Sequence, residues 1–149
     1  MQTRSLVRAV SLISVAAISI SCAGPRDSGE SEASSVGTYE ELVAALRDNG
    51  SAVESLDPIS QPFFLPEGQV ISVDGHQVQV FEYSSEEDAS SAAETISSDG
   101  GSIGTTMVSW VEAPHFFRSG SLIVLYVGED DAAVEDLQAV LGPQIAGRQ

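Results

Sequence analysis

The sequence predicts an α+β fold: a single domain over residues 38–149 with a mainly antiparallel sheet and helices packed on it. Three observations indicate this class. Three segments carry apolar residues at helical spacing between polar start signals and glycine-containing stops. The Asp74-Gly75 pair between two apolar stretches is a strong signal for a β-hairpin. No sustained strand–helix–strand rhythm is present, so the elements follow the order α-β-β-β-α-β-β-α.

Each helix is predicted from residues that favour its start. Thr38 and Glu41 fit a capping box, Ser84-Ser85 precede the second helix, and Asp130 precedes the third. In the first half of the chain we expect a helix over 38–49, a strand over 51–57, a loop with Phe63-Phe64 and a hairpin over 69–83. A second helix follows and ends at Asp99-Gly100-Gly101. We then expect a strand from Thr105 to Glu112, which Ala113-Pro114 interrupts and His115 to Arg118 resumes, a strand over 122–127, and a last helix that ends at Gly142-Pro143.

The stretch Leu122 to Val127 is apolar at every position. A strand of this kind is typical of the middle of a sheet, where both faces are covered. We expect helices on one face. The Phe63-Phe64 loop or a partner would cover the other.

Composition excludes several classes of function. The chain has 149 residues, 22 acidic residues, six arginines, no lysine and a net charge of −16, which excludes a nucleic-acid binder that relies on a basic face. One cysteine excludes an internal disulfide and a cysteine-based zinc site. Two histidines, His76 and His115, are too few for a multi-histidine metal centre. We therefore expect neither a metal nor a cofactor.

The N-terminus has the pattern of a secretory signal peptide over residues 1–21. Arg4 and Arg8 precede an apolar run from Ala9 to Ile20, which ends at Ser21-Cys22. As a helix this run would span about 18 Å, too short for a hydrocarbon core of about 30 Å. The segment therefore indicates export rather than a membrane-spanning helix.

The stretch Ile18-Ser19-Ile20-Ser21-Cys22 resembles the lipobox of bacterial lipoproteins, with Ser19 where leucine is commonest. The resemblance implies a diacylglyceryl thioether on Cys22, cleavage between Ser21 and Cys22, and acylation of the new amino group by a fatty acid such as palmitate. The alternative is an ordinary signal peptide with an incidental Cys22. The resemblance implies that the protein is anchored in the cell membrane, on its extracytoplasmic face. In a cell with an outer membrane, this means the periplasmic side.

Residues 22–37 predict a lipidated cysteine followed by a flexible tether, because they show no period and Val36 is their one sizeable apolar residue. Cleavage would leave four arginines against 22 acidic residues, a net charge of −18 before the termini are counted. An anionic bilayer surface would repel such a domain, so the lipid would supply the membrane attachment. Residues 100–127 also resemble a block of small bacterial lipoproteins of unknown function, a resemblance that would cover 40–147 and implies no activity.

Aromatic residues gather in two segments and form the main candidate for a binding surface. They are Phe63, Phe64, Trp110, Phe116 and Phe117, five of the nine aromatic residues. If they meet at the surface, they form an apolar patch for an unidentified protein or small molecule. If they are buried, they belong to the core, which is the interpretation we favour for so small a domain.

His115 is the candidate catalytic residue. A general base needs a nucleophile and an orienting group within reach, and Ser109, Ser119 and Glu112 are near it in sequence. No Gly-x-Ser-x-Gly motif accompanies it, so a histidine satisfied by backbone or water is the simpler interpretation.

Two further clusters have structural explanations. The glycines of 100–104 lack the lysine and the following helix of a phosphate loop, which favours a helix-to-strand connection. Glu129-Asp130-Asp131 lack the spacing of a calcium loop, which favours helix capping.

Two classes of function remain. The first is a membrane-anchored, non-catalytic binding or interaction module. The alternative is a small extracytoplasmic enzyme that uses His115 with a nearby carboxylate. We favour the module and assign no catalytic residue.

Overall fold

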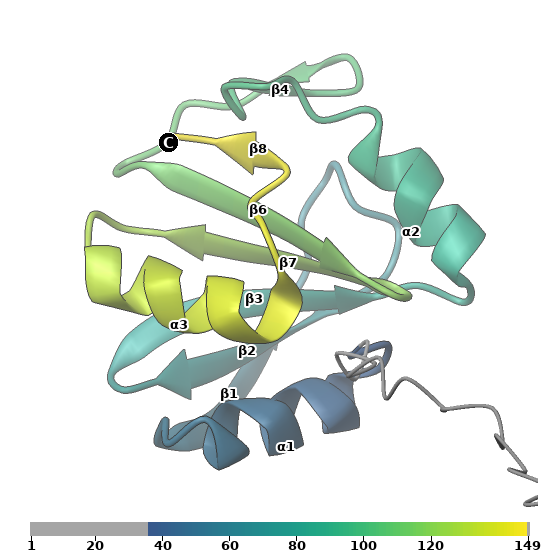
Figure 1. The fold of residues 1–149 in the computed structure, drawn as a ribbon. Coiled ribbons are helices and arrows are strands. Elements are labelled where there is room, and N and C mark those ends of the chain that lie inside the picture. The colour runs from purple at the N-terminus through teal and green to yellow at the C-terminus, as the bar shows by residue number, and fades with distance from the viewer. Residues whose placement is uncertain (1–35, 149) are drawn as a thin grey trace, which may run out of the picture. The chain divides into compact units, whose positions relative to one another are not determined.

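The computed structural model describes residues 36–148, which form three helices around an antiparallel sheet (Figure 1). The α+β class and the expected order of the main elements are confirmed. The elements are α1 (Tyr39–Asp48), β1 (Val53–Ile59), β2 (Gly68–Val73), β3 (His76–Glu82), α2 (Glu86–Ala93), β4 (Ser102–Ile103), β5 (Thr106–Met107), β6 (Pro114–Ser119), β7 (Leu122–Val127), α3 (Asp131–Leu141) and β8 (Ala146–Gly147).

Six strands form the main sheet in the order β1-β2-β3-β7-β6-β8, and β4 pairs separately with β5. Asp74 and Gly75 adopt positive φ angles of 50° and 90°, as the tight β2–β3 turn requires. Pro58 lies in the edge strand β1, where a bulge accommodates the missing N–H. The strand β7 pairs with β3 on one side and β6 on the other, so its predicted central position is confirmed.

The two faces of the sheet carry separate apolar cores. Leu122, Val124 and Tyr126 of β7 pack with α1 and α3. Ile123 and Leu125 face the other way and pack with α2 and with the Phe63-Phe64 loop. The sequence did not decide what covers the second face of β7, and the structure shows that this loop and α2 cover it together.

The predicted helix starts are confirmed at all three caps. Thr38 and Glu41 form a complete capping box, Ser85 accepts a hydrogen bond from the Asp88 N–H, and Asp130 accepts one from the Ala133 N–H. The predicted end of α2 is wrong, because the helix stops at Ala93. Ile96 instead forms an isolated bridge with Ile103, which draws the chain into the β4–β5 hairpin.

The predicted strand from Thr105 to Glu112 is also wrong. Only Thr106–Met107 of this stretch forms a strand, the two-residue β5, and the chain then runs irregularly as far as Pro114. The side chains of this stretch do alternate between the core and solvent. Val108 and Trp110 pack on the core, whereas Met107 and Val111 are 89% and 94% exposed. The segment adds no strand to the main sheet, in which β8 pairs with the outer edge of β6.

The packed domain begins two residues earlier than the predicted boundary at Thr38. Val36 is buried in the core beneath α1, and the Gly37 carbonyl accepts hydrogen bonds from Ser121. The end of the predicted tether is therefore part of the domain. The signal peptide, Ser21, Cys22 and the tether up to residue 35 lie outside the described residues.

Candidate functional site

The five candidate aromatic residues do not form one exposed patch. Four of the rings contact one another in a chain. The ring centroid of Phe63 lies 5.0 Å from that of Phe64 and 6.1 Å from that of Trp110, and the centroids of Trp110 and Phe116 are 5.8 Å apart. Phe117 lies on the opposite face of the sheet, in the core below α1 and α3. Phe64, Phe116 and Phe117 are buried, while Phe63 and Trp110 are half-buried. Most of these rings are thus core residues, and Phe63 and Trp110 connect that core to the surface.

Trp110 is fixed by a polar contact as well as by its ring neighbours. Its indole N–H donates to the Gly100 carbonyl at 2.7 Å. Gly100 has a φ of 69°, and an added Cβ would lie 2.9 Å from the Phe116 ring. The glycine cluster therefore provides a helix-to-strand connection that holds the 108–113 loop against the core.

His115 is a buried residue whose two ring nitrogens each lie within hydrogen-bond distance of an oxygen. Its side chain is 8% exposed, Nδ1 lies 2.8 Å from Gln144 Oε1, and Nε2 lies 3.1 Å from the Gly128 carbonyl oxygen. The ring also stacks on Tyr126 at 5.7 Å. Gln144 in turn donates from Nε2 to the Arg148 carbonyl at 2.8 Å. His115 thus ties β6 to the C-terminal segment.

The residues of the catalytic alternative are not brought together around His115. Ser119 is four residues along β6, about 13 Å away at the rise of a strand. Glu129 and Asp131 border a small cavity of about 270 Å³ beside His115, but neither hydrogen-bonds the ring, and Glu129 pairs with Arg148 at 3.1 Å. Among the described residues, this arrangement offers His115 no hydrogen-bonded nucleophile.

A groove of about 810 Å³ opens between three segments of the chain, of which the second and third follow each other closely in sequence. These are the loop that carries Phe63 to Pro66, α2, and the β4–β5 hairpin. Figure 1 shows the chain running from the end of α2 into β4, so the helix and the hairpin are neighbours along the chain. Phe63, Leu65 and Ile103 give the groove an apolar wall. Its size is within the usual range of small-molecule and peptide sites.

Hydroxyl groups follow the side of α2 that borders the groove. Ser84, Asp88, Ser91 and Thr95 recur at intervals of three and four residues; Asp88 and Ser91 lie within α2, and Ser84 and Thr95 flank its two ends. Thr105 and Thr106 add two hydroxyls from the opposite hairpin. The groove thus combines an apolar wall with a rim of neutral donors and acceptors.

Asp88 supplies a negative charge to this rim. The Ser84 hydroxyl donates to Asp88 Oδ2 at 2.6 Å. The hydrogen bonds from Ser84 and then Ser85 lower the pKa of Asp88 below its ordinary value of 3.8, so the carboxylate stays ionised at neutral pH. Glu82 also borders the groove, but its carboxylate accepts from the Tyr39 N–H at 3.4 Å, at the start of α1.

Tyr83 lies in the groove wall with its hydroxyl in the neutral state. Burial raises the pKa of Tyr83 to about 12 from an ordinary value of 10.0. The phenol therefore remains both a donor and an acceptor at neutral pH. Tyr83 thus adds a neutral polar group to a lining that also contains the carboxylates of Glu82 and Asp88.

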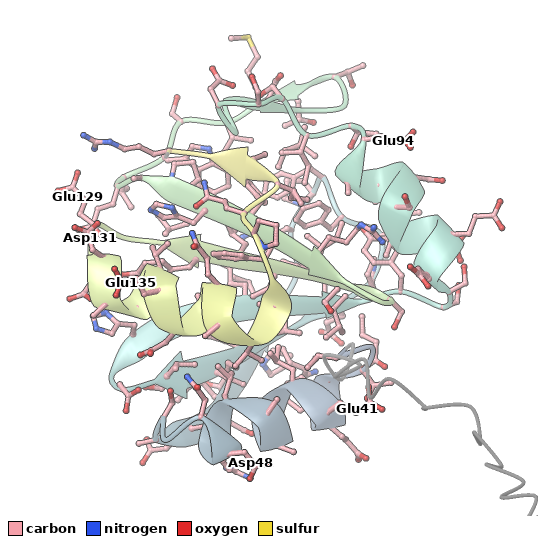
Figure 2. The ribbon with its side chains drawn as sticks, viewed as in Figure 1. Glu41, Asp48, Glu94, Glu129, Asp131 and Glu135 are labelled. Atoms are coloured by element: carbon pink, nitrogen blue, oxygen red, sulfur yellow. The ribbon has the colours of Figure 1, made fainter. Side chains whose placement is uncertain are left out.

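The remaining acidic residues act as caps and surface charges. Figure 2 shows Glu41 and Asp48 on α1, Glu94 just after α2, and Glu129, Asp131 and Glu135 around the start of α3, all at the periphery. Asp130 caps α3, as the sequence favoured. Within residues 36–148, no group of three histidine, cysteine or carboxylate side chains is arranged to hold a metal ion.

Comparisons with known proteins give no relative for this chain. Neither a scan against protein-family models nor searches of curated proteins and solved structures found a match. In the part of the chain that the structure describes, no helix has the length and apolarity to cross a membrane.

The groove was not predicted from the sequence. Of its lining residues, only Phe63 was a candidate for binding, and Ile103 to Thr106 belong to the glycine-rich stretch that was interpreted as a connection. One signal was available: Ser84, Asp88, Ser91 and Thr95 repeat at intervals of three and four residues along α2 and its flanks. In the sequence this repeat looks like an ordinary solvated helix face, and its role emerges only when the loop and hairpin are placed beside it.

Proposed function

We propose that this chain is a lipid-anchored, extracytoplasmic binding module, and that the groove beside α2 is its ligand site. The proposed anchor is Cys22, on the strength of the lipobox resemblance. The tether before Val36 would then connect the lipid to the domain. The net charge of −18 expected after cleavage supports the need for a lipid, because an anionic membrane surface would repel the domain.

The observation that carries the binding role is the chemistry of the groove. Ligand sites are concave and mostly apolar, with a few polar groups that fix orientation. The groove has Phe63, Leu65 and Ile103 on its wall and hydroxyls on two sides. The enzyme alternative has less support, because the hydrogen-bond neighbours of the His115 ring are the Gln144 side-chain oxygen and the Gly128 carbonyl oxygen, neither of which is a nucleophile.

A fragment screen on the full chain in a nonionic detergent tests the binding role. Small neutral molecules with an aromatic ring and an amide should shift the NMR amide signals of Ser91, Thr95 and Thr106. Ser91→Phe should fill the groove and abolish these shifts. The matched control Ala132→Phe, at an exposed position of α3, should retain them.

Two results would contradict the proposal. Fragments that bind nowhere on the domain would remove the groove as a ligand site. Fragments that instead gather around His115 would favour the enzyme alternative.

A further inference from the structure

The groove has a one-sided charge pattern. Asp88 faces it as a carboxylate, and no arginine, lysine or histidine is among its lining residues. Glu86 and Glu87 share the first turn of α2 with Asp88. The nearby Arg118 is paired with Glu86 at 3.6 Å. A ligand that enters here therefore meets negative charge, which favours a cation.

An apolar surface lies across the groove from Asp88. Leu65 is 98% exposed although it lines the groove, and Phe63 behind it is half-buried. An exposed leucine beside an open aromatic ring gains from being covered, at about 25 cal/mol for each Å² of apolar surface removed from water. The ligand that fits carries an apolar group next to its cation.

The hydroxyl rim favours a peptide over a simple amine. Ser91 and Thr106 carry neutral hydroxyls that both donate and accept, whereas Thr95 donates to the Ala92 carbonyl at 2.7 Å and is left as an acceptor. Main-chain amides present donors and acceptors in alternation, and hydroxyls on both sides of an extended groove can match them. A small amine would use Asp88 and leave this rim unpaired.

We infer that the groove binds a basic peptide segment, with a lysine or arginine side chain on Asp88 and a neighbouring apolar side chain on Phe63 and Leu65. This inference rests on the proposed function and identifies the chemistry of its ligand. The peptide would belong to a partner outside the cytoplasm.

The test is fluorescence anisotropy of short labelled peptides with the full chain in a nonionic detergent at physiological ionic strength. The probe is an amidated hexapeptide that alternates lysine and leucine. Matched peptides replace either the lysines by glutamate or the leucines by serine. We expect the lysine–leucine peptide to bind more tightly than both, and to change the fluorescence of Trp110, the single tryptophan, through its contact with Phe63.

Asp88→Asn should weaken binding of the lysine–leucine peptide about fivefold, the upper range for an exposed ion pair. Glu87→Gln is the matched control, since it removes the same charge from the same helical turn outside the groove lining. It should change the affinity less than twofold. The Ser85 cap of α2 accepts from the Asp88 main-chain N–H, so Asp88→Asn leaves that bond in place.

Several outcomes would overturn the inference. Equal weakening by the two variants would show general attraction to an acidic protein, and equal binding of the serine peptide would show that the apolar wall is unused. A third outcome would assign Leu65 to a membrane: the protein binds neutral lipid vesicles, Leu65→Ser abolishes that binding, and the peptide anisotropy does not change when protein is added. If no peptide binds while neutral fragments still shift Thr95 and Thr106, the peptide inference fails and the binding module stands.

Discussion

Gly37 and Ser121 are joined by two hydrogen bonds across 84 residues of sequence. The Gly37 carbonyl accepts from the Ser121 main-chain N–H at 3.2 Å and from its hydroxyl at 2.6 Å. The turn between β6 and β7 is thereby tied to the residue at which the proposed tether enters the domain. Val36, one residue earlier, is buried beneath α1, so this entry point is fixed on both sides.

Ser121→Ala should lower the free energy of unfolding by about 0.5–1.5 kcal/mol, because it removes one of these two hydrogen bonds. A urea titration measures the change. Ser109→Ala is the control, an exposed serine in the 108–113 loop, and should change stability by less than about 0.5 kcal/mol. Equal effects of the two substitutions would show that the entry point is not held by Ser121.

Local signals in the sequence predicted the parts of the fold that local interactions determine. The caps at Thr38, Ser85 and Asp130 and the turn at Asp74-Gly75 involve neighbours within four residues, so their chemistry is visible in sequence. The apolar run of β7 identified the central strand because burial on two faces leaves no polar position.

The errors arose where a distant segment decided the outcome. The stretch from Thr105 to Glu112 alternates like a strand, yet β8, a two-residue strand from the C-terminus, occupies the edge of β6. The end of α2 depends on the bridge between Ile96 and Ile103 rather than on Asp99. The groove combines the Phe63 to Pro66 loop with the stretch from Glu82 to Thr106, so no local pattern predicts it.

Leu125→Ala should lower the free energy of unfolding by about 2–5 kcal/mol, the usual range for a fully buried leucine. Val111→Ala, in the segment that was expected to be a strand, should change it by less than about 0.5 kcal/mol, since Val111 is 94% exposed. Urea titrations of both variants measure the difference. A large effect of Val111→Ala would contradict the irregular, exposed course of residues 108–113.

Glu41 should make α1 sensitive to acid. Hydrogen bonds from the Gly37 and Thr38 N–H groups lower the pKa of Glu41 below its ordinary value of 4.5. Its stabilising contribution is therefore complete above about pH 4.5 and is lost as the pH falls through the lower, folded-state pKa. Glu41→Ala should accordingly reduce the Tm at neutral pH and have little effect at strongly acidic pH.

Glu40→Ala is the matched control for Glu41, because it removes the same charge from the same helical turn. The difference in Tm between the two variants should be largest at neutral pH and should disappear on acidification. A difference that stays constant with pH would show that the Glu41 carboxylate does not act through its ionised form.

The proposal that a lipid on Cys22 holds this domain at a membrane is tested by labelling with a radioactive fatty acid. The protein is produced in bacterial cells supplied with labelled palmitate, as wild type and as Cys22→Ala. We expect label on the wild-type chain and none on the variant, which should accumulate as an uncleaved or mislocalised precursor. A wild-type chain without label, or equal label on both chains, would show that Cys22 carries no lipid.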